Sequence, residues 1–255
     1  MEFKDILYDK KDGIVTITLN RPKSMNAMST NTISEIARAL TEADMDDEVL
    51  VLILTGAPPA FCAGDDLSEF QTVNISKGRF LARNFTQTML LIERISKPVI
   101  ASVNGIAFAG GFELALACDI TIASDKATFG LPEPRVGAVA GFAAMRLPQV
   151  VGLKKARELL FTCDTIDAKE AERLGIVNKV VPADQLTATT LAMAEKLKRS
   201  APVSIWLSKN MANGLAGGRE LAMSTGGTIL MFGTEDLKEG YSAFLQKRKP
   251  QFKGK

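Results

Sequence analysis

Residues 105–113 read GIAFAGGFE, and this stretch decides how the chain folds. The preceding residues 99–103 (VIASV) are typical of a buried strand, and residues 112–117 (FELALA) are typical of an apolar helix. The glycine pair Gly110-Gly111 therefore lies at a helix N-terminus, where backbone N–H groups lack intrahelical partners and carry partial positive charge. Such N–H groups can bind a carbonyl oxygen. A tight strand-to-helix turn explains the glycines equally well.

Two glutamates follow such turns. Glu113 ends the first stretch, and Glu133 ends residues 129–133 (FGLPE), between Pro132 and Pro134. A glutamate in an apolar helix is rarely buried without a reason, because ionisation there costs desolvation energy. The pair therefore suggests acid/base chemistry. The alternatives are that Glu113 points to solvent or a salt bridge, and that Glu133 is an exposed loop charge beside Arg135.

A third turn, residues 61–66 (FCAGDD), has the same design. Ala63, Gly64, Asp65 and Asp66 provide candidate N–H donors for a second contact to the same carbonyl. Taken alone, this turn is better explained as an aspartate-rich N-cap of a helix starting near Leu67. A reactive Cys62 is the less favoured interpretation, and a small buried apolar residue is the favoured one.

The absence of histidine restricts the chemistry most. With no histidine in 255 residues, Ser-His and Cys-His nucleophile pairs, imidazole metal sites and histidine general bases are all excluded. Any acid/base catalyst must then be Glu, Asp, Lys, Tyr or Cys. The carboxylates become the leading candidates.

The overall composition is that of an ordinary soluble globular protein, with 46% hydrophobic and 24% charged residues. A net charge of +2 gives no indication of nucleic-acid binding, and no apolar run approaches the length of a membrane span. The three cysteines contain no Cys-x-x-Cys pair, which argues against disulfides or a thiolate zinc site. The first five residues are charged, without the apolar stretch of a signal peptide. We expect a cytoplasmic protein.

The pattern of apolar residues predicts an α/β fold. Strands are expected at residues 14–19, 49–55, 99–103, 120–123 and 177–181, and helices at 33–40 and 78–95. Thr32 and Glu35 have the spacing of a capping box for the first helix. Phe61, Phe108 and Phe129 each follow a similar strand and turn at unequal intervals. This echo predicts a superhelix of strand-strand-helix turns whose equivalent loops stack on one side.

After about residue 185 the strand signals end. Helices are expected at residues 186–198, 202–215 and 235–247. A helical region that cannot bury its own apolar faces often packs on a partner subunit. The basic tail after Lys247 and the basic turn at Arg21 are either phosphate-binding or simply solvated, and solvation is the commoner case.

Together these segments resemble the crotonase superfamily, the enoyl-CoA hydratase/isomerase group. The resemblance is carried in order by residues 19–27 (LNRPKSMNA), 60–67 (AFCAGDDL), 97–105 (KPVIASVNG), 109–115 (AGGFELA), 118–119 (CD), 129–133 (FGLPE) and 239–248. It implies an α/β crotonase-like spiral of ββα turns over residues 1–195. It also implies a C-terminal helical trimerisation region over residues 196–255, assembled as trimers or dimers of trimers.

The resemblance further implies an acyl-CoA thioester substrate, with coenzyme A part of that substrate and no metal or redox cofactor. Ala63 and Gly110 would donate the oxyanion-hole N–H groups, and Glu113 and Glu133 match the two glutamates of the hydratases. The expected substrate-binding residues are Arg21, Ala27, Ala63, Gly64, Asp65, Asp66, Leu67, Gly110 and Gly141.

The expected reaction is reversible syn addition of water across an α,β double bond. Glu113 would deprotonate a water that attacks Cβ, and Glu133 would protonate Cα, with mutual repulsion pushing their protonation states apart. One departure from the family is residues 140–146 (AGFAAMR), where hydratases often have a Pro-Gly-x-Gly-Gly-type stretch. Phe142 is expected to narrow or reshape the acyl pocket, which favours a branched or cyclic acyl group.

The alternatives are an enoyl-CoA isomerase, which needs only one well-placed carboxylate, and another crotonase-family thioester reaction such as hydrolysis or decarboxylation. A catalytically silent acyl-CoA-binding homologue belongs to a different class. The presence of both glutamates favours the hydratase over all of these.

Overall fold

The larger of two sheets carries most of the core. The computed structural model describes residues 2–69, 75–214 and 234–255. Its larger sheet contains β1 (Ile6–Lys11), β2 (Ile14–Leu19), β3 (Val51–Gly56), β4 (Val99–Val103), β6 (Ile120–Ser124) and β9 (Lys179–Val181), side by side in that order. β1 pairs antiparallel with β2, and all the other neighbours are parallel. The apolar runs of β3 and β4 are buried because both faces of the sheet are covered.

The smaller sheet contains β5 (Ile106–Phe108), β7 (Thr128–Gly130) and β8 (Ile166–Asp167). The chain passes from β4 to β5, then from β6 to β7, so each turn places one strand in each sheet before a helix follows. The predicted α/β spiral of ββα turns is confirmed.

Stacking of the turns is confirmed in the register of the small sheet. Cys62 forms a parallel bridge with Ala107, and Ala107 is paired with Phe129. Three turns distant in sequence therefore lie next to one another. The phenylalanines of the sequence echo are not in register, because Phe108 is paired with Gly130 instead of Phe129. Phe61 and Phe129 are buried in the core, whereas Phe108 is only partly buried.

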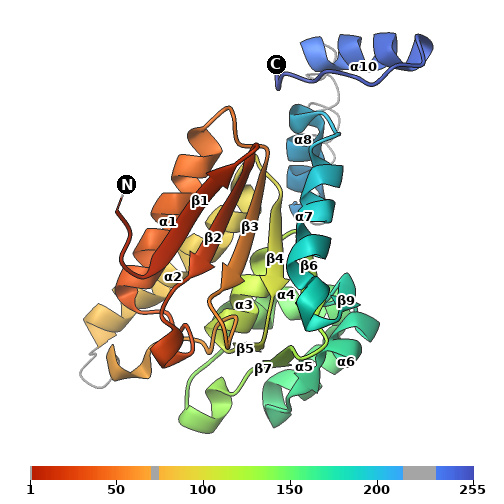
Figure 1. The fold of residues 1–255 in the computed structure, drawn as a ribbon. Helices are drawn as coiled ribbons and strands as arrows, with labels where there is room; N and C mark the ends of the chain where they lie inside the picture. The colour runs from red at the N-terminus through yellow and green to blue at the C-terminus, as the bar shows by residue number, and fades with distance from the viewer. Residues whose placement is uncertain (1, 70–74, 215–233) are drawn as a thin grey trace.

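Helices cover both faces of the larger sheet (Figure 1). The α-helices in the described part of the chain are α1 (Thr30–Met45), α2 (Ile75–Arg94), α3 (Gly110–Ala117), α4 (Gly141–Val151), α5 (Leu153–Thr162), α6 (Ala168–Arg173), α7 (Leu186–Leu197), α8 (Pro202–Asn213) and α10 (Glu235–Leu245). Short 3₁₀ helices are η1 (Pro22–Ser24), η2 (Leu67–Glu69), η3 (Glu133–Val136) and η4 (Ala183–Gln185). Leu52 and Leu54 face the main core with α1 and α2, and Val51 and Ile53 face α7. Strand alternation thus divides the core into two layers.

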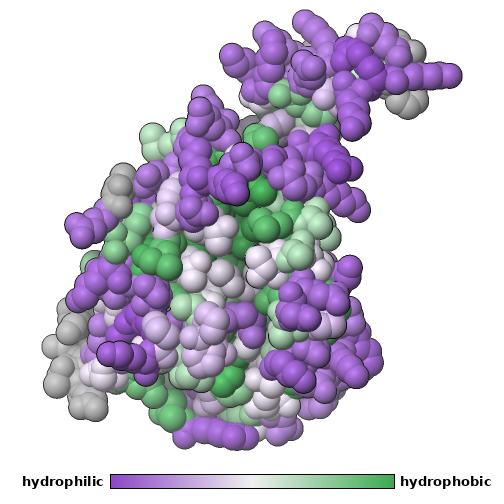
Figure 2. Space-filling model, viewed as in Figure 1, coloured by the Kyte–Doolittle hydropathy of each residue, from purple (hydrophilic) through white to green (hydrophobic). Residues whose placement is uncertain are grey.

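The helices after β9 form a column beside the sheet that leads to α10 (Figure 1). On the face seen in Figure 2, apolar residues gather where the sheet meets this column, while α10 is mostly hydrophilic. Leu191 of α7 and Trp206 of α8 are exposed, at 42% and 39%. Among the described residues, no helix combines the length and apolarity needed to cross a bilayer.

The predicted helix capping is wrong by one turn. Ser29, not Thr32, is the N-cap of α1, and Thr32 occupies the position that returns the bond to the cap backbone. Glu35 instead accepts the N–H groups of Lys4 and Asp5 at 2.9 and 2.8 Å. Ser29 was hidden by a sequence in which several residues have capping chemistry. The predicted helix at 202–215 ends at Asn213, and residue 215 lies outside the described residues.

Candidate active site

The turn at residues 62–66 lies against the start of α3. The Phe108 N–H donates to the Cys62 carbonyl at 3.0 Å, and a Cβ placed on Gly64 would lie 3.6 Å from the Gly110 nitrogen. Ala109, the N-cap of α3, has φ of 49°, which is uncommon for a residue with a side chain. This bend brings the N-terminus of α3 up to the Gly64 turn. Two glycine turns that are far apart in sequence, residues 62–66 and 109–111, thus lie together and form one wall of the candidate site.

The N–H groups of Asp65 and Gly110, like that of Gly111, have no acceptor among the described residues. Asp65 forms a parallel bridge with Met28 in which Gly64 and Asp66 make the hydrogen bonds. The Asp65 N–H therefore points away from Met28, on the side of Gly110. Gly110 is the first residue of α3, so its N–H has no intrahelical partner.

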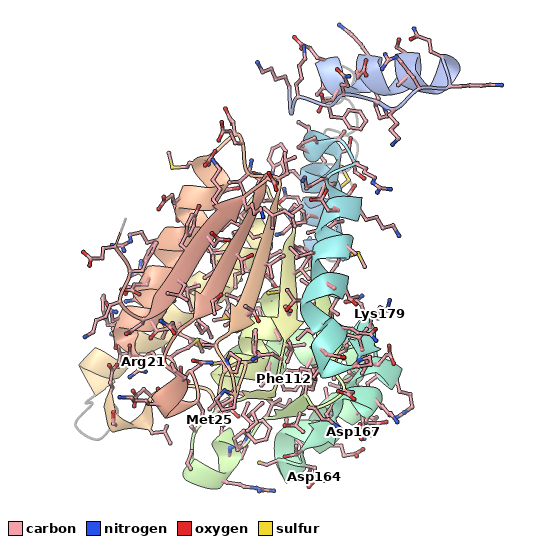
Figure 3. The ribbon with its side chains drawn as sticks, in the orientation of Figure 1. Arg21, Met25, Phe112, Asp164, Asp167 and Lys179 are labelled. Atoms are coloured by element: carbon pink, nitrogen blue, oxygen red, sulfur yellow. The ribbon has the colours of Figure 1, made fainter. Side chains whose placement is uncertain are left out.

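The prediction that Ala63 is a donor conflicts with the structure. The Ala63 N–H donates to the carbonyl of Met25 at 3.0 Å, so it is already engaged within the main chain. Met25 and Phe112 of α3 both lie towards the end of the large sheet that adjoins the small one (Figure 3). The N–H that faces α3 is that of Asp65, two residues after Ala63, because the chain turns at Gly64. The sequence shows the turn but not this direction.

Glu113 is buried inside the molecule, at 3% exposure, and does not point to solvent. Its Oε1 accepts the N–H of Ala143, at the start of α4, at 2.7 Å. Burial, together with repulsion from Glu133 and Asp65, outweighs the opposing Ala143 and Phe142 N–H groups and raises the pKa of Glu113 to about 7. A carboxyl group with that pKa is ready to exchange a proton at neutral pH.

Glu133 opens η3 and is half-buried. Its Oε2 is buried and has no hydrogen-bond partner among the described residues. Burial raises the pKa of Glu133 above the usual value. Arg135, the alternative partner, donates instead to the carbonyl of Thr162 at 3.3 Å. The protonated form of Glu133 is therefore favoured more than in an exposed glutamate.

Asp65 contributes a third carboxyl group; the sequence predicted it as a backbone donor and substrate-binding residue, but not as an acid. Burial and, to a lesser extent, the charge of Glu133 raise its pKa to about 6. Electrostatic coupling links Asp65 to both glutamates. Three acids thus lie close enough to influence one another's charge. Within the described part of the chain, no group of three or more His, Cys, Asp or Glu side chains is arranged to hold a metal ion.

Three of the predicted substrate-binding residues meet in one cluster. The Arg21 guanidinium donates to the Ala27 carbonyl and forms an ion pair with Asp66 at 2.8 Å. Arg21 is thus anchored beside the Gly64 turn, and Asp66 balances its charge. Leu67, next along, is 61% exposed at the rim. Gly141 is separate from this cluster and opens α4, with nothing within 4 Å of where its Cβ would be.

Apolar side chains crowd the other side of Gly110. A Cβ there would lie 2.9 Å from Cε of Met28 and 3.0 Å from Cε2 of Phe85. Phe142, expected near the acyl pocket, is buried in the main core at 2% exposure. Its effect on acyl preference stays a prediction. Cys62 is fully buried, and burial raises the pKa of its thiol to about 12, which agrees with the apolar interpretation.

The chain matches the family model for enoyl-CoA hydratase/isomerase over residues 9–255. The chain belongs to the enoyl-CoA hydratase/isomerase family. It is 40% identical to a short-chain-enoyl-CoA hydratase of Clostridium acetobutylicum, covering 98% of this chain and 97% of that protein. It is also 40% identical to a crotonyl-CoA hydratase of Syntrophomonas wolfei, covering 99% of both.

Solved structures of the family superpose closely on this fold. The enoyl-CoA hydratase of Bacillus anthracis matches with a TM-score of 0.94 at 35% identity, covering 99% of this chain and 100% of that one. A Geobacillus kaustophilus enoyl-CoA hydratase subunit matches at 0.94 and 37%, covering all of both chains. The expected membership of the crotonase superfamily and the α/β crotonase fold are both confirmed.

Proposed function

We propose that this family member catalyses reversible syn addition of water to an α,β-unsaturated acyl-CoA thioester. One observation carries the proposal: two unpaired backbone N–H groups adjoin carboxyl groups with raised pKa values on the same wall. Relatives named as hydratases support it at 40% identity over nearly the whole chain.

The N–H groups of Asp65 and Gly110 are the proposed oxyanion hole. Hydrogen bonds from both to the thioester oxygen polarise the carbonyl, so Cβ becomes electrophilic and the developing enolate charge is stabilised. The partial positive charge at the N-terminus of α3 acts on the same oxygen. Asp65 replaces Ala63 in this role because the Ala63 N–H is bonded to Met25.

The two glutamates take different parts in the proton transfers. Glu113 is the proposed base: the Ala143 N–H favours its ionised form, which removes a proton from the water that attacks Cβ. Glu133 is the proposed acid: its buried, unpartnered Oε2 favours the protonated form, which delivers a proton to Cα. Water and proton then arrive on one face of the double bond.

A panel of enoyl-CoA thioesters beginning with crotonyl-CoA tests the reaction by mass spectrometry. We expect a mass gain of one water with wild-type protein, and loss of about a hundredfold or more in kcat with Glu113→Gln and with Glu133→Gln. Near-normal rates in both variants would contradict the mechanism. Isomerisation without water gain, or binding without turnover over the whole panel, would contradict the reaction.

We also propose a homotrimer or a dimer of trimers, with residues 196–255 as the oligomerisation region beside the core of residues 1–195. The exposed Trp206 within this region and Leu191 just before it support the idea, because a partner copy would bury them. Light scattering coupled to gel filtration should give a mass of three or six chains. A monomer would contradict it.

A cytoplasmic location is proposed as well. Cys62, Cys118 and Cys163 are all free thiols in the structure, which fits a reducing compartment. Fractionation of the source cells with antibody detection would test the location.

A further inference from the structure

An ion pair away from the candidate reacting groups bridges α2 and α4. The Arg146 guanidinium of α4 contacts Glu93 of α2 in a bidentate manner, with Nε–Oε1 at 2.6 Å and Nη2–Oε2 at 2.7 Å. Their side chains are 25% and 11% exposed. Bidentate pairs of this kind fix orientation as well as distance.

The first turn of α4 is held by the buried side chains of Phe142 and Ala143 but has no N-terminal cap from its own residues. Its N-cap, Ala140, provides no side-chain cap, and Pro148 within the helix removes one backbone donor. The Ala143 N–H lies in this first turn and has no acceptor within the helix. It donates instead to Oε1 of Glu113, on α3. Glu113 therefore caps α4, and the position of α4 sets the hydrogen bond to Glu113.

Arg146 lies one helical turn after Phe142, and its Cζ stands 5.7 Å from the centre of that ring. Phe142 is buried in the main core. The Ala143 N–H thus lies between a core anchor and an ion-pair anchor on the same helix. α3 packs against both α2 and α4, so the pair closes a ring of three helices around Glu113.

Glu93 itself stands on a pinned backbone. Asn213 of α8 donates to the Glu93 carbonyl at 2.9 Å, and Lys209 of α8 donates to the Ile92 carbonyl at 2.7 Å. The Lys209 ammonium, 4% exposed, also pairs with Asp119 at 2.8 Å. Two contacts from α8 to adjacent carbonyls therefore fix the α2 end of the bridge, and Asp119 holds the Lys209 that makes one of them.

We propose that Arg146 and Glu93 are positioning residues for Glu113, acting by holding α4 so that the Ala143 N–H stays on the Glu113 carboxylate. This rests on the proposed function only for the rate effects. The pair carries no net charge, and the carboxyl groups that act directly on Glu113 are Glu133 and Asp65. The ion pair therefore acts on Glu113 by fixing the position of α4, and not by its own charge.

Paired variants separate a positional effect from an electrostatic one. Arg146→Gln leaves a negative charge and Glu93→Gln leaves a positive one, so purely electrostatic effects would shift the pKa of Glu113 in opposite directions. Loss of position weakens the Ala143 bond in both variants and raises the pKa in both. Arg173→Gln is the matched control, because Arg173 and Glu170 form a bidentate pair with both contacts at 2.7 Å on α6.

The readout is the titration of Glu113 by NMR of protein labelled with carbon-13 at the glutamate carboxyl, assigned by signal loss in Glu113→Gln. We expect both variants to raise the pKa by about half to one unit, and Arg173→Gln to leave it unchanged. Arg146→Lys keeps the positive charge but cannot make the bidentate contact, so its Glu113 pKa should lie between those of wild type and Arg146→Gln. Unchanged or opposite shifts in folded Arg146→Gln and Glu93→Gln would overturn the proposal.

Hydration kinetics provide the second readout. On the substrate that wild type hydrates, kcat at neutral pH should fall about two- to sixfold in both variants, with KM within about twofold. The acid limb of the pH–rate profile should move to higher pH. A loss of thermal stability with an unmoved limb would assign the pair a structural role only. If wild type hydrates no thioester, the proposed function fails, while the NMR titration still decides the positioning.

Discussion

Glu113 and Glu133 occupy contrasting regions of the same wall. Glu113 stands on a regular helix, fully buried, with one oxygen bonded to the Ala143 N–H. Glu133 stands on a single 3₁₀ turn, half-buried, with Oε2 left without a partner in the described chain. Burial raises both pKa values; the Ala143 and Phe142 N–H groups oppose this at Glu113, whereas at Glu133 only its own backbone N–H does. Local hydrogen bonding, more than depth, separates a proposed base from a proposed acid.

The backbone next to Glu113 is also more tightly packed than the backbone next to Glu133. A Cβ on Gly111, beside Glu113, would lie 2.2 Å from the carbonyl oxygen of Cys62. A Cβ on Gly137, just after Glu133, would meet nothing within 4 Å. The first region is locked against the neighbouring turn, and the second is open.

The largest expected effect tests this difference in packing. Gly111→Ala should lower the free energy of unfolding by about 3 kcal/mol or more, since a backbone oxygen cannot move aside easily. Gly137→Ala should cost about 1 to 2 kcal/mol, because only the left-handed φ is strained there. Urea unfolding followed by circular dichroism measures both. Equal losses would remove the contrast between the two regions.

The next effect concerns the stability cost of the buried base. The pKa of Glu113 is raised from 4.5 to about 7 in the folded chain. Stability from this group is thus complete below about pH 4.5 and is lost as the pH rises through about 7, by up to about 3 kcal/mol. Glu113→Gln should therefore stabilise the protein at about pH 8.5 and do little at about pH 5.

Denaturant curves at those two pH values provide the check. Glu133→Gln is the comparison variant: its pKa is also raised, so the gain has the same sign, and it should be smaller because the side chain is half-exposed. A larger gain in unfolding free energy from Glu133→Gln than from Glu113→Gln would contradict the expectation that Glu113 has the more strongly raised pKa.

A smaller effect is expected from Asp65. Its charge contributes to the raised pKa of Glu113. Asp65→Asn removes that repulsion while keeping the backbone N–H, so the acid limb of the pH–rate profile should move down by about half a pH unit. Asp47→Asn, at an exposed position, is the control. An upward shift would show that Asp65 stabilises the ionised glutamate by some other contact.

The smallest effect is expected at Cys62, which lies beneath the locked region. Because burial raises its thiol pKa to about 12, iodoacetamide should leave Cys62 unmodified in the native protein at about pH 8. Peptide mapping by mass spectrometry, with urea-unfolded protein as the reactive reference, measures the modification. Rapid native labelling would show that the Gly111 contact opens readily.

The sequence predicted the strands and their stacking well, because buried runs such as residues 51–56 and 99–103 have few other ways to fold. It also predicted that Glu113, Glu133 and Gly110 would be brought to one place. It missed the direction of single N–H groups. Whether Ala63 or Asp65 faces Gly110 depends on the positive φ of Gly64, at 109°, which residue types alone do not reveal.

Contacts between distant helices were missed for a similar reason. Residues 140–146 attracted attention only as a departure from a family pattern, whereas in the structure Ala143 donates to Glu113 and Arg146 pairs with Glu93. Glu93 carried no signal, since a glutamate near the end of an amphipathic helix is usually solvated. Its partner is 53 positions away, and only the fold brings them together.

The histidine-free composition gives the three-carboxyl wall a consequence for calorimetry. With no imidazole in the chain, few groups besides Asp65 and Glu113, whose pKa values are raised to about 6 and about 7, exchange protons near neutrality. When a thioester covers this wall, the protons taken up or released therefore come largely from these acids. Measuring the binding heat in buffers of different ionisation enthalpy would count them, with little background from the rest of the molecule.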